Sequence, residues 1–242
     1  MVIGAAWVAG AAVVCAAHVV FGLAGFGVGL VAMAFLPYVM STTTAVVLMT
    51  LYATIFAVVI FAPLRRDVAW RPLAGLTLSS LAGTPVGIWV LASAPATVVN
   101  RALGSMLVVV VLAEFARRMP RRLTAPGWGV GAGVLAGLTG GPVGLPGPPM
   151  IAYATTQPWG ARTFKANLQA FFIVNQSATL LGYWLAGFIT ADVLRLAAAY
   201  MIPALGGTLV GMRLFDRIDP VRFRQIVFAM LLVSGVVLLV RG

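Results

Sequence analysis

A nine-residue glycine motif occurs twice in this chain, once in each half, and both copies lie inside long apolar stretches. GLAGFGVGL at Gly22 to Leu30 returns as GLTGGPVGL at Gly137 to Leu145, with six of the nine positions identical. Backbone inside a lipid bilayer must satisfy its own hydrogen bonds, so a broken helix is tolerated there only against protein or a water-filled cavity. Two related breaks, one in each half, predict the kind of binding site that transporters place between their repeats.

The composition indicates a polytopic membrane protein. Hydrophobic residues make up 62% of the 242 residues and charged residues 9%, whereas soluble domains carry roughly 25% charged residues. The formal net charge of +11 does not indicate a nucleic-acid partner, because the basic residues cluster in short loops between apolar runs and no nucleic-acid-binding module accompanies them. We expect the partners to be the lipid bilayer and a small anionic substrate, and we leave a homodimer open.

The similarity between the halves extends beyond the glycine motif. LAGTPVG at Leu81 to Gly87 resembles LGGTLVG at Leu205 to Gly211. The expected fold is therefore all-α, with two inverted-topology repeats, residues 1–122 and 123–242, each holding a broken or re-entrant helix hairpin plus three transmembrane helices. The predicted segments are hairpin 2–40 with spans 44–63, 72–91 and 96–115, and hairpin 127–156 with spans 164–189, 193–212 and 221–240.

Charge supports this topology. If the loop around Arg65 lies inside, thirteen of the sixteen basic residues fall on inside loops and only Arg101, Arg195 and Arg241 fall outside. Such a bias is typical of cytoplasmic loops. The first apolar stretch is long enough to span fully, so the side on which the N-terminus lies stays open. The stretch has no preceding Lys or Arg, so we expect no cleaved signal peptide.

The motifs predict helix ends that open inside the membrane. We expect breaks at Gly22 to Gly27 and at Thr139 to Pro149, the second holding too many glycines and prolines for an α-helix. Pro148 and Pro149 suit the first turn of a new helix. Free N–H groups and the helix dipole at such a start form an anion site without a cationic side chain. The alternative is that the glycines serve close helix packing, as we expect for the Gly-x-x-x-Gly patterns starting at Gly83 and Gly207.

Two further features concern polar side chains in apolar segments. Asn175 and Gln176 lie near the centre of a predicted span, where amides must face the bundle or a cavity. They are candidates either for substrate binding or for hydrogen bonds between helices. His18 is the one plausible proton carrier within the bilayer, and a buried imidazole with satisfied hydrogen bonds is the alternative.

Gly-Phe-Gly-x-Gly at Gly25 to Gly29 and GLTGGPVGLPGPP at Gly137 to Pro149 resemble the sulfite exporter TauE/SafE family. The resemblance covers essentially the whole chain, although the first copy lacks the prolines of the second. It implies a secondary carrier for anions such as sulfite, sulfoacetate, thiosulfate or aryl sulfonates, in a bacterial or archaeal plasma membrane. It also implies that the family's glycine-motif loops lie at Gly25 to Gly29 and Gly140 to Gly147.

These observations predict a secondary transporter that binds a small sulfur-containing or organic anion near the bilayer midplane, for export, with one repeat rocking against the other. The sequence shows no catalytic constellation and no metal or nucleotide motif, so we expect neither an enzyme nor a cofactor. A passive anion channel, an uptake permease and a structural or assembly subunit remain open alternatives. The predicted substrate-binding residues are Gly25, Phe26, Gly27, Gly29, Gly140, Gly141, Val143, Gly144, Asn175 and Gln176.

Overall fold

The computed structural model describes residues 5–93, 95, 97–98, 101, 104–105, 108–109, 111–112, 126–143 and 147–241, and the regular elements in these ranges are all helices. The first half contains α1 (Ala5–Ala24), α2 (Val28–Phe35), the 3-10 helix η1 (Leu36–Tyr38), α3 (Thr42–Phe61), the 3-10 helix η2 (Ala62–Asp67) and α4 (Trp70–Ser93). The second half contains α6 (Pro126–Val143), α7 (Gly147–Thr155), α8 (Ala161–Leu185), α9 (Ala191–Phe215) and α10 (Pro220–Arg241). The predicted span 96–115 lies mostly outside the described residues.

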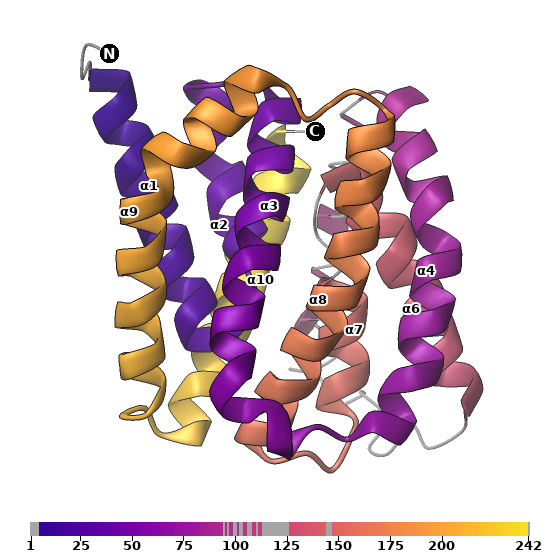
Figure 1. Ribbon diagram of the computed structural model, residues 1–242. Coiled ribbons are helices and arrows are strands. Elements are labelled where there is room, and N and C mark those ends of the chain that lie inside the picture. The colour runs from indigo at the N-terminus through magenta and orange to yellow at the C-terminus, as the bar shows by residue number, and fades with distance from the viewer. Residues whose placement is uncertain are drawn as a thin grey trace.

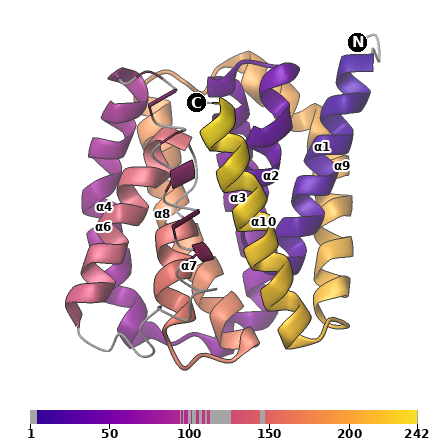
Figure 2. The ribbon, with the colours of Figure 1, turned by 180° about the vertical axis from the view of Figure 1, so that it is seen from behind.

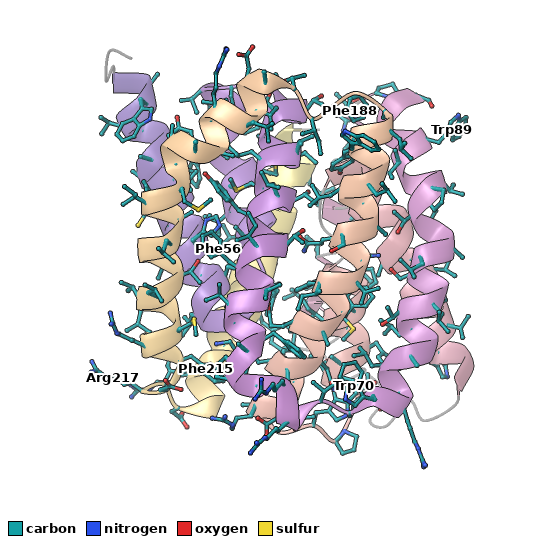
Figure 3. All side chains as sticks on the ribbon, in the orientation of Figure 1. Phe56, Trp70, Trp89, Phe188, Phe215 and Arg217 are labelled. Atoms are coloured by element: carbon teal, nitrogen blue, oxygen red, sulfur yellow. The ribbon has the colours of Figure 1, made fainter. Side chains whose placement is uncertain are left out.

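Helix length and composition fit a membrane protein. Within the described part of the chain, three helical segments are long and apolar enough to cross a bilayer: Ala6–Ala24, Thr42–Asp67 and Ala191–Phe215. α4 adds exposed tryptophans at its two ends, Trp70 and Trp89 (Figure 3). Their separation is about 28 Å at 1.5 Å per residue, close to the ~30 Å hydrocarbon core of a bilayer. Tryptophan gathers at the two membrane interfaces, so α4 also has the dimensions of a span.

The helices form two lobes, and each lobe contains segments from both halves of the sequence (Figures 1 and 2). In the first lobe α1 packs along α9, and α2 contacts α1, α3 and α10. In the second lobe α4 packs along α6, and α8 contacts α4, α6 and α7. α3 and α8 face each other where the lobes meet. Among the described elements, η2 joins the lobes at one end of the molecule and the α8–α9 connection joins them at the other.

Glycines explain why α1–α9 and α4–α6 are the closest helix pairs. A Cβ placed at Gly22 would overlap the carbonyl oxygen of Thr208, and one placed at Gly211 would overlap that of Val19. The α4–α6 pair packs in the same way, because a Cβ at Gly137 would overlap the carbonyl oxygen of Ser80. Small residues let helix backbones approach closely. The packing role expected for the Gly-x-x-x-Gly patterns is confirmed, and the first glycine of each repeated motif shares it.

The first helix break is shorter than the sequence predicts. Gly22 lies within α1, which continues to Ala24, so the break consists of Gly25 to Gly27 and the expected start at Gly22 is wrong. Packing accounts for this difference, because Gly22 is held in the helix by its contact with α9. In the second part of the predicted hairpin 2–40, α2 ends at Phe35 and the chain continues as η1, whose second residue is Pro37.

α6 and α7 extend into the region where the sequence predicts the second break, Thr139 to Pro149. α6 runs through Thr139, Gly140 and Gly141 to Val143, so the prediction that unwound backbone begins at Thr139 is wrong. The low helix propensity of glycine, about 1 kcal/mol per residue, is outweighed where α6 packs against α4. α7 begins at Gly147, with Pro148 and Pro149 in its first turn as predicted. Gly144 lies outside the described residues.

Candidate functional site

The first break is a glycine turn whose freed carbonyl groups are bound by side chains of α8. Gly25 and Gly27 have φ values of 80° and 89°, a left-handed conformation that costs glycine little and other residues much more. Lys165 Nζ donates to the Gly22 carbonyl at 2.7 Å, and Gln169 Nε2 donates to the Gly25 carbonyl at 2.6 Å. The carbonyl groups at a helix end have no partner within the helix. α8 thus supplies donors to the broken end of α1 across the boundary between the lobes.

Lys165 is enclosed at this position. Its side chain is 2% exposed, although it belongs to the first turns of α8. The ammonium nitrogen lies 3.7 Å from the centroid of the Phe215 ring, near the end of α9. The aromatic face attracts a cation electrostatically. A carbonyl oxygen and a ring face therefore surround the amine.

The second break approaches the same helix. Gly147, at the start of α7, is close enough to Phe172 of α8 that an added Cβ would lie 3.6 Å from the ring. Phe172 is 2% exposed. Lys165 and Phe172 are about 10 Å apart along the helix axis at 1.5 Å per residue. α8 therefore contacts the first break and the start of α7 within two helical turns, with a polar surface towards the first break and an aromatic surface towards Gly147.

Asn175 does not present the free donor that the sequence predicts. Its Nδ2 donates to the hydroxyl groups of Ser80 and Thr84 on α4. The Thr84 hydroxyl donates to the Ser80 carbonyl, so its oxygen is available to accept. This pattern fixes the amide orientation and leaves Oδ1 of Asn175 buried without a hydrogen-bond partner. In this conformation the amide hydrogens of Asn175 are used within the protein and its unpartnered group is an acceptor, while a role in substrate binding stays a prediction.

Further buried polar atoms lack a protein partner. They include Gln176 Oε1, Gln169 Oε1 and His18 Nε2. His18 Nδ1 donates to the Val14 carbonyl at 2.8 Å, which leaves Nε2 as an acceptor in a shell of Phe21, Tyr52 and Phe56 rings. Buried polar groups usually have a partner in the protein or in ordered water. Each of these atoms is a hydrogen-bond acceptor without a partner among the described residues.

The structure separates the predicted site residues into distinct groups. Gly25, Phe26 and Gly27 form the first break, whereas Gly140, Gly141 and Val143 belong to the last turn of α6. Sequence reasoning missed Lys165, which it counted with the inside loops, and Gln169. The available signal was their spacing: positions 165, 169, 172 and 176 follow one face of a helix. Of the residues that the structure describes, no group of three His, Cys, Asp or Glu could hold a metal ion.

The chain is similar to known proteins along most of its length. The family model described as sulfite exporter TauE/SafE matches residues 9–238. The chain is 27% identical over 226 residues to the probable sulfite/organosulfonate exporter TauE of Cupriavidus necator, an alignment that covers 87% of this chain and 85% of the relative. No solved structure matches the chain.

Proposed function

The chain belongs to the sulfite exporter TauE/SafE family, and from that premise we propose that it carries a small sulfur-containing or organic anion across the membrane by alternating access. The substrate class we propose is sulfite, sulfoacetate or another sulfonate, moved outward. The observation that carries the proposal is the first break, where α8 of one lobe binds the open end of α1 in the other. A contact of this kind can form in one state of a carrier and open in another.

The lobes suggest which parts move. The helix pairs α1–α9 and α4–α6 each join a helix of one half to a helix of the other, which is the pairing that our proposal of two inverted repeats requires. In our proposal the moving units are the two lobes, rather than the two halves of the sequence as first expected. The anion binds between the lobes near the breaks, at residues 25–29 and 140–147 and beside α8. Asn175 Oδ1 and Gln176 Oε1 accept hydrogen bonds from water that accompanies it.

The proposed orientation places the end with η2 in the cytoplasm. η2, the α7–α8 connection and the α9–α10 connection lie together at the end of the molecule where Trp70 and Arg217 are labelled (Figure 3). They carry Arg65, Arg66 and Arg217. Basic residues concentrate on cytoplasmic loops. We propose a multi-pass protein of a bacterial or archaeal plasma membrane, and the homodimer stays a prediction.

Counterflow tests the proposed function. Purified protein is reconstituted into liposomes loaded with sulfite or sulfoacetate, and uptake of the same labelled anion is followed against protein-free liposomes. A carrier exchanges label against its internal load and saturates, so we expect transient accumulation above equilibrium. Flux without counterflow would favour an anion channel. Absence of flux, and of thermal stabilisation, across a panel of sulfur oxyanions and carboxylates would favour a structural subunit.

The proposed role of Asn175 is tested with a matched control on the same helix, α8. Asn175→Leu removes the bonds to α4 and the free acceptor together, and we expect flux to fall at least tenfold. Ser177→Ala changes an exposed neighbour and should leave flux within a factor of two. Folding of both variants is checked by size-exclusion chromatography in detergent. Near-normal flux of folded Asn175→Leu would remove this residue from the proposed site.

A further inference from the structure

The chain contains a single lysine, and it is buried at the boundary between the lobes. All other basic residues are arginines, fifteen of them, and Lys165 is the exception. Lysine carries a compact charge with three donors on a flexible stem. Its place against the Gly22 carbonyl puts that charge at the point where α8 of the second lobe meets the end of α1 of the first.

The hydrogen bonds and ion pairs of the described residues leave the charge of Lys165 incompletely balanced. Nζ donates to one acceptor, the Gly22 carbonyl. The two ion pairs found among the described residues, Arg162–Asp67 and Arg195–Asp192, do not include it. Asp216, exposed after the end of α9, acts on it electrostatically without forming a direct pair. A buried charge without a paired counterion is costly, so an anion close to Nζ would be favoured.

Capping the broken helix does not by itself require a charge. One turn along α8, Gln169 performs the same task at the Gly25 carbonyl with a neutral amide. The two neighbouring caps therefore differ in one property, the positive charge that the ammonium of Lys165 carries and the amide of Gln169 lacks. That difference calls for a function beyond holding the carbonyl group.

We propose that Lys165 is the group that recognises the anion, by pairing its ammonium with a sulfonate or sulfite-like oxyanion at the first glycine break. This inference rests on the proposed transport function. The bond to the Gly22 carbonyl occupies the amine while the lobes are closed at this end. When they part, the anion replaces the carbonyl as the partner of Nζ, so substrate binding and opening of the first break are coupled.

Variants that remove or keep the positive charge test the proposal, with sulfoacetate as the probe and chloride at equal ionic strength as the reference. Lys165→Gln keeps a donor for the Gly22 carbonyl but removes the charge, and its apparent affinity, measured from thermal stabilisation, should fall at least tenfold. Lys165→Arg should retain more of the affinity than Lys165→Gln. Arg162→Gln removes a positive charge from the same helix at an exposed site and should stay within a factor of two of wild type.

The single lysine permits a second test that needs no substitution. Wild-type protein is acetylated with an N-hydroxysuccinimide ester, and modification of Lys165 and of the α-amino group is followed by mass spectrometry. Sulfoacetate should slow acetylation of Lys165 at least threefold and leave the α-amino group unaffected. This measurement decides the question if Lys165→Gln fails to fold.

The outcomes distinguish the inference from the function on which it rests. Stabilisation and transport by wild type, with unchanged affinity in Lys165→Gln, would overturn the role of Lys165 and leave transport standing. Equal slowing of both amines, or of neither, would overturn it as well. A wild-type protein that neither responds to any anion of the panel nor transports one would overturn the proposed function and this inference together.

Discussion

At the first break the chain turns on two glycines of positive φ, Gly25 and Gly27, whereas beyond the second break α7 starts on Gly147 followed by two prolines. The first break needs outside donors for its carbonyl groups, and α8 provides an amine and an amide. At the second, proline has no N–H to satisfy and is well suited to a first helical turn. The side chain of α8 that faces Gly147 is correspondingly an aromatic ring.

This difference teaches that related segments in the two halves can perform different tasks. The first break has polar partners and depends on contacts across the boundary between the lobes. At the second, backbone conformation and apolar packing define the structure that is described. Regulation of access to the anion is therefore expected to centre on the first break, and the two breaks should respond differently to substitution.

The largest expected effect comes from the feature that the two motifs share. Gly22→Ala and Gly137→Ala each place a Cβ onto the backbone of a facing helix, which must move away. Overpacking typically costs 1–3 kcal/mol and occasionally more, and we expect both variants to lose about 3 kcal/mol or fail to fold. Thermal unfolding in detergent measures this loss. Gly206→Ala, where an added Cβ has open space, should behave like wild type. A Gly22→Ala protein as stable as wild type would contradict the close packing of α1 against α9.

A smaller effect is expected at the first turn itself. Gly25→Ala forces a left-handed conformation on a residue with a side chain and brings its Cβ to 2.9 Å from Gln169 Nε2. Strained backbone of this kind costs of order 1–3 kcal/mol, so we expect a loss of about 2 kcal/mol, measured by thermal unfolding. Gly160→Ala is the control, because its φ is −67° and the space around it is open. Equal stability of both variants would show that the first break is not a tight turn.

The smallest losses of stability are expected for substitutions on α8, where Gln169 represents its polar surface and Phe172 its aromatic surface. Gln169→Leu leaves the Gly25 carbonyl without its donor, which costs about 1–3 kcal/mol for a buried group. Part of this cost is offset because the unpartnered Oε1 of Gln169 also disappears. Phe172→Leu, facing the second break, should cost about 1 kcal/mol through lost packing. Thermal unfolding compares the two, and a larger loss in Phe172→Leu would reverse the assignment of the polar role to the first break.

The sequence predicts the helical class, the first break and a helix start at Pro148 and Pro149 because glycine and proline act locally on the backbone. It misplaces the ends of the breaks because tertiary contacts override local preference. Gly22 stays helical where it touches α9, and Gly140 and Gly141 stay helical in α6. The spacing of Lys165 and Gln169 is visible in the sequence, but the carbonyl groups they bind belong to a segment more than a hundred residues away. The pairing of helices across halves follows from shape complementarity, which one sequence does not disclose.

The exchange of helices between the halves has a consequence for biosynthesis. α1 is made well before α9, yet its glycine-lined side fits against α9, which is translated only after α8 is complete. Until then that side must remain in lipid or against another protein of the insertion machinery. Neither half can close its own packing surface alone, so two separately expressed fragments would have to meet in the membrane before either acquires its native neighbours.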